Sequence, residues 1–114
     1  MIDQVRPSDL AAWLQVQGTA SLPPVVLDVR EPWEVQTASV KPDGFSLVAI
    51  PMNEIPARLA ELDPAQPVAC LCHHGARSQR VALFLAQNGF SRLANIAGGI
   101  EAWSRELDSG VPRY

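Results

Sequence analysis

The stretch "PVACLCHHGARSQRVALFLAQN", from Pro67 to Asn88, decides the fold class because it joins a strand pattern to a helix pattern through a short loop. The run from Pro67 to Cys72 is short and apolar, which is typical of a strand buried on both faces of a sheet. After the loop, Val81, Phe84 and Leu85 recur at helical spacing. They predict a helix over residues 78–88 that packs its apolar stripe on that sheet.

Other segments repeat this alternation of strand and helix. We therefore expect an α/β fold with a central parallel sheet flanked by helices. One stretch, from Thr37 to Phe45, is predicted to be an irregular loop. The remaining predicted strands are Val25–Val29, Ser46–Pro51 and Leu93–Ala97, and the remaining predicted helices are Arg6–Gly18, Asn53–Leu62 and Ile100–Leu107.

The composition indicates one domain over residues 1–114, since 114 residues with 47% hydrophobic content suffice for one core. Nine basic and twelve acidic residues give a formal net charge of −3, and the basic residues are scattered. This balance argues against a nucleic-acid or membrane partner. The start lacks a charged region followed by an apolar one, so we expect no secretory signal and a cytoplasmic, reducing setting.

The two cysteines, Cys70 and Cys72, are predicted to be free thiols. On one strand their Cβ atoms would lie about 6.6 Å apart, whereas a disulfide tolerates about 4.5 Å. Cys70 lies inside the strand, so packing is favoured over a resolving-thiol role. Cys72 ends the strand, and a nucleophilic role is favoured there over that of a small buried side chain.

The position of Cys72 has a chemical meaning because ligands gather at the carboxyl ends of parallel strands. A turn followed by a helix N-terminus directs several N–H groups at one point, which favours a thiolate over a thiol. Gly75 permits a turn with positive φ, Arg77 supplies a cation with a planar fork, and Ser78 offers a hydroxyl. The pattern predicts a nucleophilic cysteine in an anion-binding loop.

A metal site is a weaker interpretation of the same loop. Structural zinc sites use spaced pairs of ligands, whereas Cys70, Cys72, His73 and His74 are crowded into five positions. We therefore predict no metal. His73 and His74 are interpreted as partly exposed loop side chains that contact substrate or tune the local field, and neither is assigned as a catalytic base.

Five stretches together resemble the rhodanese family of sulfurtransferases, specifically its small single-domain type. Each is only suggestive alone, but in this order they form a specific signature that spans nearly the whole chain. The stretches are "LDVREPWE" (27–34), "CHHGARS" (72–78), "GF" (89–90), "GGIEAW" (98–103) and "VPRY" (111–114).

The resemblance implies a rhodanese-like fold and a persulfide on Cys72. In the family's reaction, the cysteine takes a sulfane sulfur from thiosulfate or a persulfide donor and passes it to cyanide, a thiol or a protein acceptor. No metal or organic cofactor takes part. The implied substrate-binding loop, in which Arg77 would hold an anionic donor, consists of His73, His74, Gly75, Ala76, Arg77 and Ser78.

Outside the loop, the resemblance implies supporting roles for Asp28, Arg30 and Trp33. Asp28 either orients a loop arginine or caps the following turn. Arg30 and Trp33 match positions at or near the pocket rim, although Trp33 could simply pack. Trp103 is expected in the core. Many members carry a Gly-His-Ile segment after the first motif, and its absence here leaves the shape of that rim open.

Two other functions remain open. Related phosphatases and arsenate reductases place five residues between cysteine and arginine, whereas this chain has four, so the smaller ring favours sulfur over a phosphoryl group. A sulfur-carrier or protein-interaction module with weak small-molecule turnover is the alternative within the family.

Overall fold

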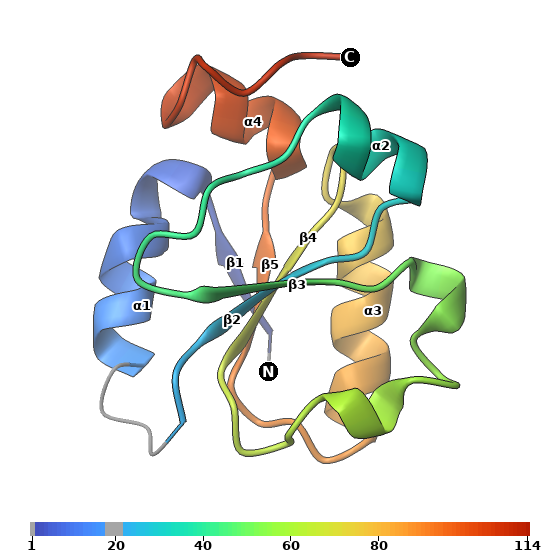
Figure 1. Cartoon of the computed structure of the whole chain (residues 1–114). Coiled ribbons are helices and arrows are strands. Elements are labelled where there is room, and N and C mark those ends of the chain that lie inside the picture. The colour runs from blue at the N-terminus through green and yellow to red at the C-terminus, as the bar shows by residue number, and fades with distance from the viewer. Residues whose placement is uncertain (1, 18–21) are drawn as a thin grey trace.

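A central sheet of five parallel strands organises the computed structural model, which describes residues 2–17 and 22–114 (Figure 1). The strand order is β1-β5-β4-β2-β3, and every described pair is parallel. The predicted fold class is therefore confirmed. The elements are β1 (Ile2–Val5), α1 (Leu10–Gln17), β2 (Val25–Asp28), α2 (Pro32–Thr37), β3 (Ser46–Ala49), β4 (Val68–Leu71), α3 (Ala76–Gln87), β5 (Leu93–Ile96) and α4 (Gly99–Glu106), with 3-10 turns at Pro7–Asp9, Met52–Glu54 and Leu59–Glu61.

Alternate residues of the central strands face two separate apolar clusters, because side chains alternate across a sheet. One cluster packs α1 and α4 against one face of the sheet, with Trp13 and Trp103 buried in it. The other packs α3 against the opposite face, with Val81, Leu85 and Cys72 among its buried members. Trp103 thus lies in the core, as expected.

The carboxyl ends of the strands meet at one edge of the sheet, where α2, the start of α4 and the end of the chain also gather (Figure 1). The last residues after α4 return toward α2, held in part by the Ser104 hydroxyl, which donates to the carbonyl of Val111 over 2.7 Å. Segments that are far apart in the sequence are therefore brought together at this edge.

The helix predicted over Asn53–Leu62 is wrong. The structure has two short 3-10 turns there, at Met52–Glu54 and Leu59–Glu61. Pro56 lies between them, and proline removes an N–H and clashes with the preceding turn of an α-helix. The segment covers the α3 side of the sheet through Ile55 and Leu62, both buried, without forming a continuous helix.

The sequence patterns also missed two elements and shifted a boundary. Strand β1 carries the exposed polar residues Asp3 and Gln4, which hid its strand character. Helix α2 has six residues, too few for a periodic pattern, although Pro32 at its start is a recognisable signal. The first helix begins with a 3-10 turn at Pro7, and its predicted end at Gly18 lies outside the described residues.

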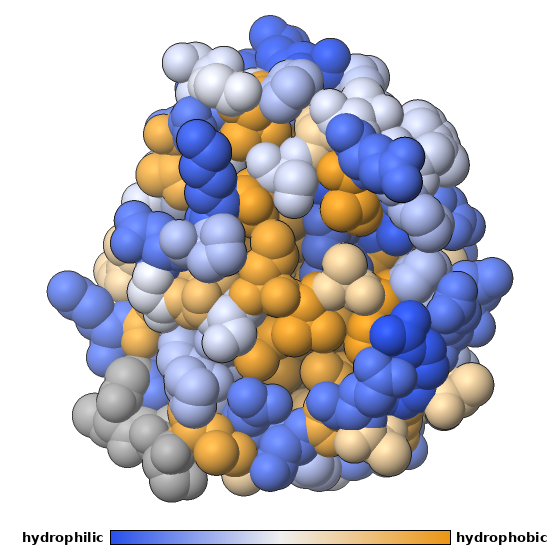
Figure 2. All heavy atoms as spheres, viewed as in Figure 1, coloured by the Kyte–Doolittle hydropathy of each residue, from blue (hydrophilic) through white to orange (hydrophobic). Residues whose placement is uncertain are grey.

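Strand β3 forms one edge of the sheet, and the two layers of helices cover the two faces of the sheet. Phe45, Leu47 and Val48 are only partly buried at this edge. Figure 2 shows apolar side chains gathered over the middle of the face on which Figure 1 draws β3. Among the described residues, no helix is long and apolar enough to cross a membrane.

Candidate active site around Cys72

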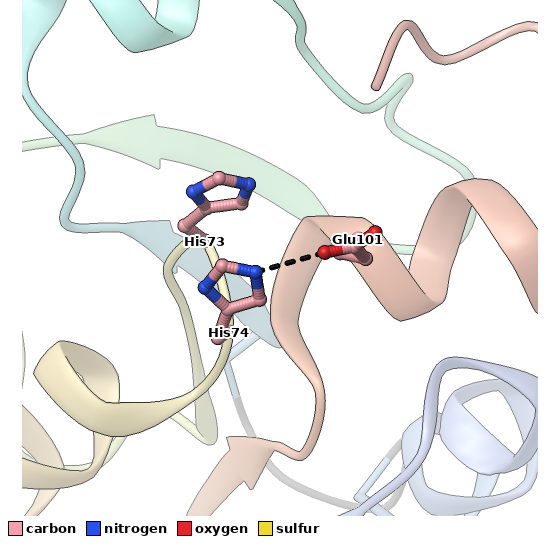
Figure 3. A group of neighbouring side chains, drawn as sticks. All are labelled: His73, His74 and Glu101. Carbon is pink, nitrogen blue, oxygen red and sulfur yellow. Dashed lines mark hydrogen bonds and ion pairs between the residues drawn. The ribbon is translucent and has the colours of Figure 1, made fainter. Parts of the chain in front are cut away.

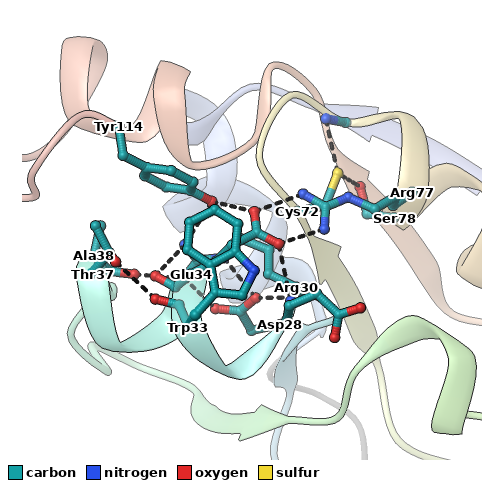
Figure 4. A network of polar contacts seen from close by, with 12 residues as sticks. Asp28, Arg30, Trp33, Glu34, Thr37, Ala38, Cys72, Arg77, Ser78 and Tyr114 are labelled. Atoms are coloured by element: carbon teal, nitrogen blue, oxygen red, sulfur yellow. Dashed lines mark hydrogen bonds and ion pairs between the residues drawn. The ribbon is translucent and has the colours of Figure 1, made fainter.

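The Cys72 sulfur lies directly after β4 and beside the N-terminus of α3 (Figure 4). The backbone N–H of Gly75 donates to Sγ over 3.0 Å, and the Ser78 hydroxyl oxygen lies 3.2 Å from Sγ. Cys72 is only 1% exposed. The sulfur therefore lies at the carboxyl end of β4, next to the turn that leads into α3, which is the location that the sequence predicted.

The loop keeps this shape because α4 supports it from behind. The N–H groups of Ile100 and Glu101 donate to the carbonyl oxygens of Cys72 (2.9 Å) and His73 (3.2 Å). This close approach requires Gly99, since a methyl group there would lie 2.4 Å from the His73 oxygen. The "GG" motif thus does more than form a tight turn: it lets α4 hold the carbonyls of the cysteine loop.

Arg77 forms a two-pronged ion pair with Glu34 of α2, through bonds of 2.6 and 2.8 Å (Figure 4). The Glu34 side chain is buried, and the Arg77 guanidinium holds the pKa of that carboxyl at about 2, well below its usual range. The fork that was expected to hold an anionic donor is therefore occupied by a carboxylate. Arg77 still contributes positive charge beside Cys72, but Glu34 balances much of it.

Asp28 and Arg30 form a second ion pair beneath α2. The Arg30 side chain donates to both carboxylate oxygens of Asp28, at 2.9 and 2.6 Å, and its backbone N–H bonds to the same carboxylate. Asp28 thus orients Arg30 and also caps its own turn, whereas the loop arginine Arg77 pairs with Glu34. Arg30 is 1% exposed, so it lies below the rim and ties α2 down through the Ala38 carbonyl.

Four aromatic side chains form an aromatic rim beside the loop: Trp33, His73, His74 and Tyr114. His73 stacks on Tyr114 with ring centroids 4.0 Å apart and on His74 with centroids 3.9 Å apart. Trp33, which is exposed, makes a T-shaped contact with Tyr114, with ring centroids 5.9 Å apart. Burial, and then the neighbouring His74, lower the pKa of His73, so at neutral pH its ring is uncharged.

Tyr114 connects the end of the chain to the ion pair of the loop. Its hydroxyl donates to Glu34 Oε2 over 2.6 Å and accepts from Arg30 over 3.1 Å. Burial is the largest effect on the pKa of Tyr114 and raises it, while Arg30 opposes the rise. The phenol therefore remains a protonated donor to Glu34 at neutral pH.

His73, His74 and Glu101 bring three ligand atoms within 4.8 Å of one another on the outer side of the loop (Figure 3). The two imidazole planes differ by only 21°, so their in-plane lone pairs run side by side instead of converging on one ion. Glu101 already pairs with His74 over 2.8 Å and with Arg113 over 3.2 Å. This arrangement favours a surface ion-pair cluster over metal coordination.

Cys70 points into the cluster under α3 and is fully buried. Burial raises the pKa of its thiol to about 12. Cys70 and Cys72 are both free thiols. The packing interpretation of Cys70 is therefore supported, and its thiol stays neutral at physiological pH.

Three residues of the site were missed by sequence reasoning: Glu34, Asn95 and Tyr114. Glu34 carried a weak signal, because it closes a capping box with Glu31 at the start of α2. Asn95 is the one polar residue in an otherwise apolar strand, β5. Tyr114 belongs to a quoted motif, but its contacts with residues 80 and 84 positions away could not be deduced from spacing.

The fold and the site together define an α/β domain with a cysteine loop at the carboxyl edge of a parallel sheet. Residues 7–106 match the family model of the rhodanese-like domain. The chain therefore belongs to the rhodanese-like domain family. This result confirms the resemblance stated from the sequence.

Known proteins of the family support this assignment. A sulfurtransferase of Allochromatium vinosum is 37% identical over 88 residues, which cover 77% of this chain and 76% of that protein. The thiosulfate sulfurtransferase GlpE of Actinobacillus pleuropneumoniae is 41% identical over 71 residues, covering 61% of this chain and 59% of GlpE. Other relatives are much longer, and the matches span 20 to 30% of them.

The solved structure of a rhodanese-related protein from Thermoplasma volcanium superposes with a TM-score of 0.74 at 28% identity. The match covers 92% of this chain and 93% of that one. Family membership and the names of these relatives support sulfur transfer as the general activity.

Proposed function

We propose that this protein transfers a sulfane sulfur from thiosulfate or a persulfide donor to a thiophilic acceptor through a persulfide on Cys72. The observation that carries the proposal is the position of the Cys72 sulfur, which receives the Gly75 N–H at the N-terminus of α3. N–H groups directed at the sulfur stabilise a negative charge that develops there during the reaction.

The proposed reaction has two displacement steps at sulfur. In the first, the Cys72 thiolate attacks the outer sulfur of thiosulfate. A new S–S bond forms, the S–S bond of thiosulfate breaks, and its electron pair leaves with sulfite. In the second, cyanide or a thiolate attacks the outer sulfur of the persulfide, and the electron pair of that S–S bond returns to Cys72. No metal or redox cofactor is needed to balance either step.

The loop would serve the intermediate more than the donor. The outer sulfur of the persulfide is negatively charged, and the loop N–H groups and the α3 dipole favour an anion there. Arg77 adds positive charge, but its two terminal nitrogens bind Glu34. Donor binding would therefore rely on the loop backbone and on the aromatic rim beside it.

Mass spectrometry of the intact protein tests the proposal. After mixing with thiosulfate, we expect the wild type to gain the mass of one sulfur atom and to lose it on addition of cyanide. Cys72→Ala should gain nothing. Cys70→Ala is the matched control, since it removes the other thiol of the chain, and it should load as the wild type does.

Two results would change the proposal. Loading of Cys72→Ala would show that Cys72 is not the carrier. Loading of the wild type by a persulfide donor but not by thiosulfate would keep Cys72 as carrier and would favour a protein-bound donor, as in the sulfur-carrier alternative. For its setting we propose a reducing cytoplasm, in which both thiols stay free.

A further inference from the structure

The Ser78 hydroxyl lies between two acceptors. Its oxygen is 2.5 Å from Oδ1 of Asn95 and 3.2 Å from Sγ of Cys72. Ser78 is fully buried and Asn95 is 4% exposed, so neither side chain is open to bulk solvent. A hydroxyl has one proton, and it can serve only one of these two acceptors at a time.

The orientation of the Asn95 amide is fixed by its other contacts. Its Nδ2 donates to the backbone oxygen of Gly75 over 3.2 Å and to Oε1 of Gln4 over 3.0 Å. The Gly75 oxygen can only accept, so the amide nitrogen must face it and Oδ1 must face Ser78. Gln4 is the register partner of Asn95 on β1 and lies at the surface, where its amide bonds to Gln79.

The short contact therefore assigns the Ser78 proton to Asn95. A protonated Cys72 is compatible with this arrangement, because its S–H can donate to a lone pair of Ser78. A thiolate in the same arrangement receives no proton from Ser78, since turning the hydroxyl toward sulfur would leave the two oxygens 2.5 Å apart without a proton between them and would strand a buried amide oxygen. A persulfide removes the conflict, because its charge lies on the outer sulfur.

We propose that Asn95 is a positioning residue that holds the Ser78 hydroxyl proton and thereby withholds it from the Cys72 thiolate. The thiolate keeps the Gly75 N–H as its close donor. Formation of the persulfide is favoured because it moves the negative charge away from the Ser78 hydroxyl oxygen, which gives the sulfur no proton. This inference rests on the proposed role of Cys72 as nucleophile. It runs against the simpler interpretation that Ser78 is present to stabilise the thiolate.

The other charged and titratable groups near Cys72 do not reproduce this effect. Arg77 of α3 is held by Glu34 of α2 and remains charged throughout the neutral and alkaline range. Cys70 of β4 stays neutral up to a pH of about 12. His73, the next residue of the loop, has a lowered pKa, so its ring is uncharged in the alkaline range. A shift caused by Asn95 can thus be separated from these groups.

The test is the pH dependence of Cys72 alkylation by iodoacetamide, measured by intact mass in the wild type and in Asn95→Ala. Removing the amide oxygen frees the Ser78 proton for the thiolate, and a hydrogen bond to a charged group should lower the midpoint of the profile by about one pH unit. A better stabilised thiolate is also a weaker nucleophile. We therefore expect alkylation about threefold faster below the midpoint and about threefold slower above it.

The crossing of the two profiles is diagnostic, because a loosened loop would change the rate in one direction at every pH. Asn88→Ala is the matched control: Asn88 lies at the exposed end of α3, where its amide bonds to the Phe84 carbonyl. Its profile should coincide with that of the wild type. Asn95→Leu, which fills more of the space without restoring an acceptor, should behave as Asn95→Ala.

A double-mutant cycle with Ser78→Ala decides the mechanism. Ser78→Ala should raise the midpoint in the Asn95→Ala background by more than it does in the wild type. Equal shifts in both backgrounds, or profiles that do not cross, would overturn the proposal. If neither Asn95 variant folds, Ser78→Ala alone decides it, since a rise of about one full unit in the wild type would show that Ser78 already donates to the thiolate.

Alkylation needs no sulfur donor or acceptor, so this test and the test of sulfur transfer fail separately. A protein that accepts no sulfur from thiosulfate can still show the crossing profiles. A protein that loads sulfur on Cys72 but shows no coupling between Ser78 and Asn95 would retain the proposed function and lose this inference.

Discussion

Helices α3 and α4 each begin on a left-handed glycine shortly after a strand of the parallel sheet. Gly75 precedes α3 with a φ of 110°, and Gly98 precedes α4 with a φ of 82°. At α4, the first N–H groups donate to the carbonyls of Cys72 and His73. At α3, the Gly75 N–H donates to the Cys72 sulfur. The same local geometry therefore meets backbone carbonyls in one case and the sulfur of the proposed nucleophile in the other.

The difference lies in what each helix N-terminus meets. The start of α4 meets backbone carbonyls, so its donors are used to shape the loop. The start of α3 meets a side chain that can carry charge. The charges of the first turns differ as well: α4 carries Glu101, which suits a helix dipole, whereas α3 carries Arg77, which opposes it until Glu34 pairs with it. The N-terminus of α3 beside Cys72 is thus held by hydrogen bonds from α4 to the cysteine loop and by the ion pair between Arg77 and Glu34 of α2.

The largest effect is expected where α4 touches the loop. Gly99→Ala would place a methyl group 2.4 Å from the His73 oxygen and 2.5 Å from the Cys72 oxygen, both in the backbone. Since neither atom can move without deforming the loop, we expect a loss of about 3 kcal/mol or more in the free energy of unfolding. Urea denaturation measures this loss. Slower alkylation of Cys72 should accompany it, because the loop would shift.

Gly44→Ala is the matched control for that change. Gly44 also has a positive φ, of 79°, but a methyl group there would meet nothing within 4 Å. Gly44→Ala should lose only the free energy needed to hold an alanine at positive φ, about 1 kcal/mol in the free energy of unfolding. If the two variants lose the same stability, then contact between α4 and the loop is not what requires Gly99.

The second-largest effect is expected at the ion pair between Glu34 and Arg77. In the folded protein the pKa of Glu34 is about 2, against an ordinary value of 4.5. A lowered folded-state pKa stabilises the protein above the unfolded value, and that stabilisation disappears as the pH falls from about 4.5 to about 2. For Glu34→Gln we expect a loss of about 3 kcal/mol at pH 7, and a smaller difference from the wild type at pH 3.

Unfolding measured at both pH values checks this prediction, with Asp43→Asn as the control. Asp43 is an exposed carboxylate in the loop before β3. Asp43→Asn therefore changes the net charge by the same amount as Glu34→Gln without breaking the ion pair between Glu34 and Arg77. A wild-type advantage over Glu34→Gln that is equal at pH 7 and at pH 3 would contradict the assigned pKa shift. An equal loss in Asp43→Asn would attribute the effect to net charge alone.

The elements that could be predicted from sequence are those with a local cause. The strand ending at Cys72 has an unbroken apolar run, the loop has Gly75 at its turn, and the following helix has a clear apolar stripe. These features specify their structure within a few residues. The position of Cys72 and of the neighbouring Gly75 and Ser78 at the carboxyl end of β4 could therefore be predicted from the sequence.

What could not be predicted depends on partners that are distant in the sequence. Glu34 meets Arg77 across 43 positions, and Asn95 meets Ser78 across 17. Neither contact leaves a periodic signal. The failure at Asn53–Leu62 has a different cause, since the pattern there was helical but Pro56 interrupts it. Arg77 illustrates the consequence for function: its position was predicted correctly, and its partner was not.

The smallest effect is expected at the hydroxyl of Tyr114. Tyr114→Phe keeps the ring that stacks on His73 but removes a donor to Glu34 and an acceptor for Arg30. We expect a loss of about 1 kcal/mol in the free energy of unfolding. The hydroxyl also helps to lower the pKa of Glu34, so in this variant the loss of the Glu34 stabilisation, which starts near the unfolded-state pKa of 4.5, should be complete at a higher pH.

Tyr114→Ala separates the two contributions of this side chain, because it removes the ring as well as the hydroxyl. A larger loss in Tyr114→Ala than in Tyr114→Phe would measure the stacking on His73. If Tyr114→Phe leaves the acid transition unchanged, then the end of the chain does not support Glu34. In that case Arg77 and the Glu31 N–H would hold the carboxylate, and the N-terminus of α3 would depend on α2 and α4 but not on the segment that follows α4.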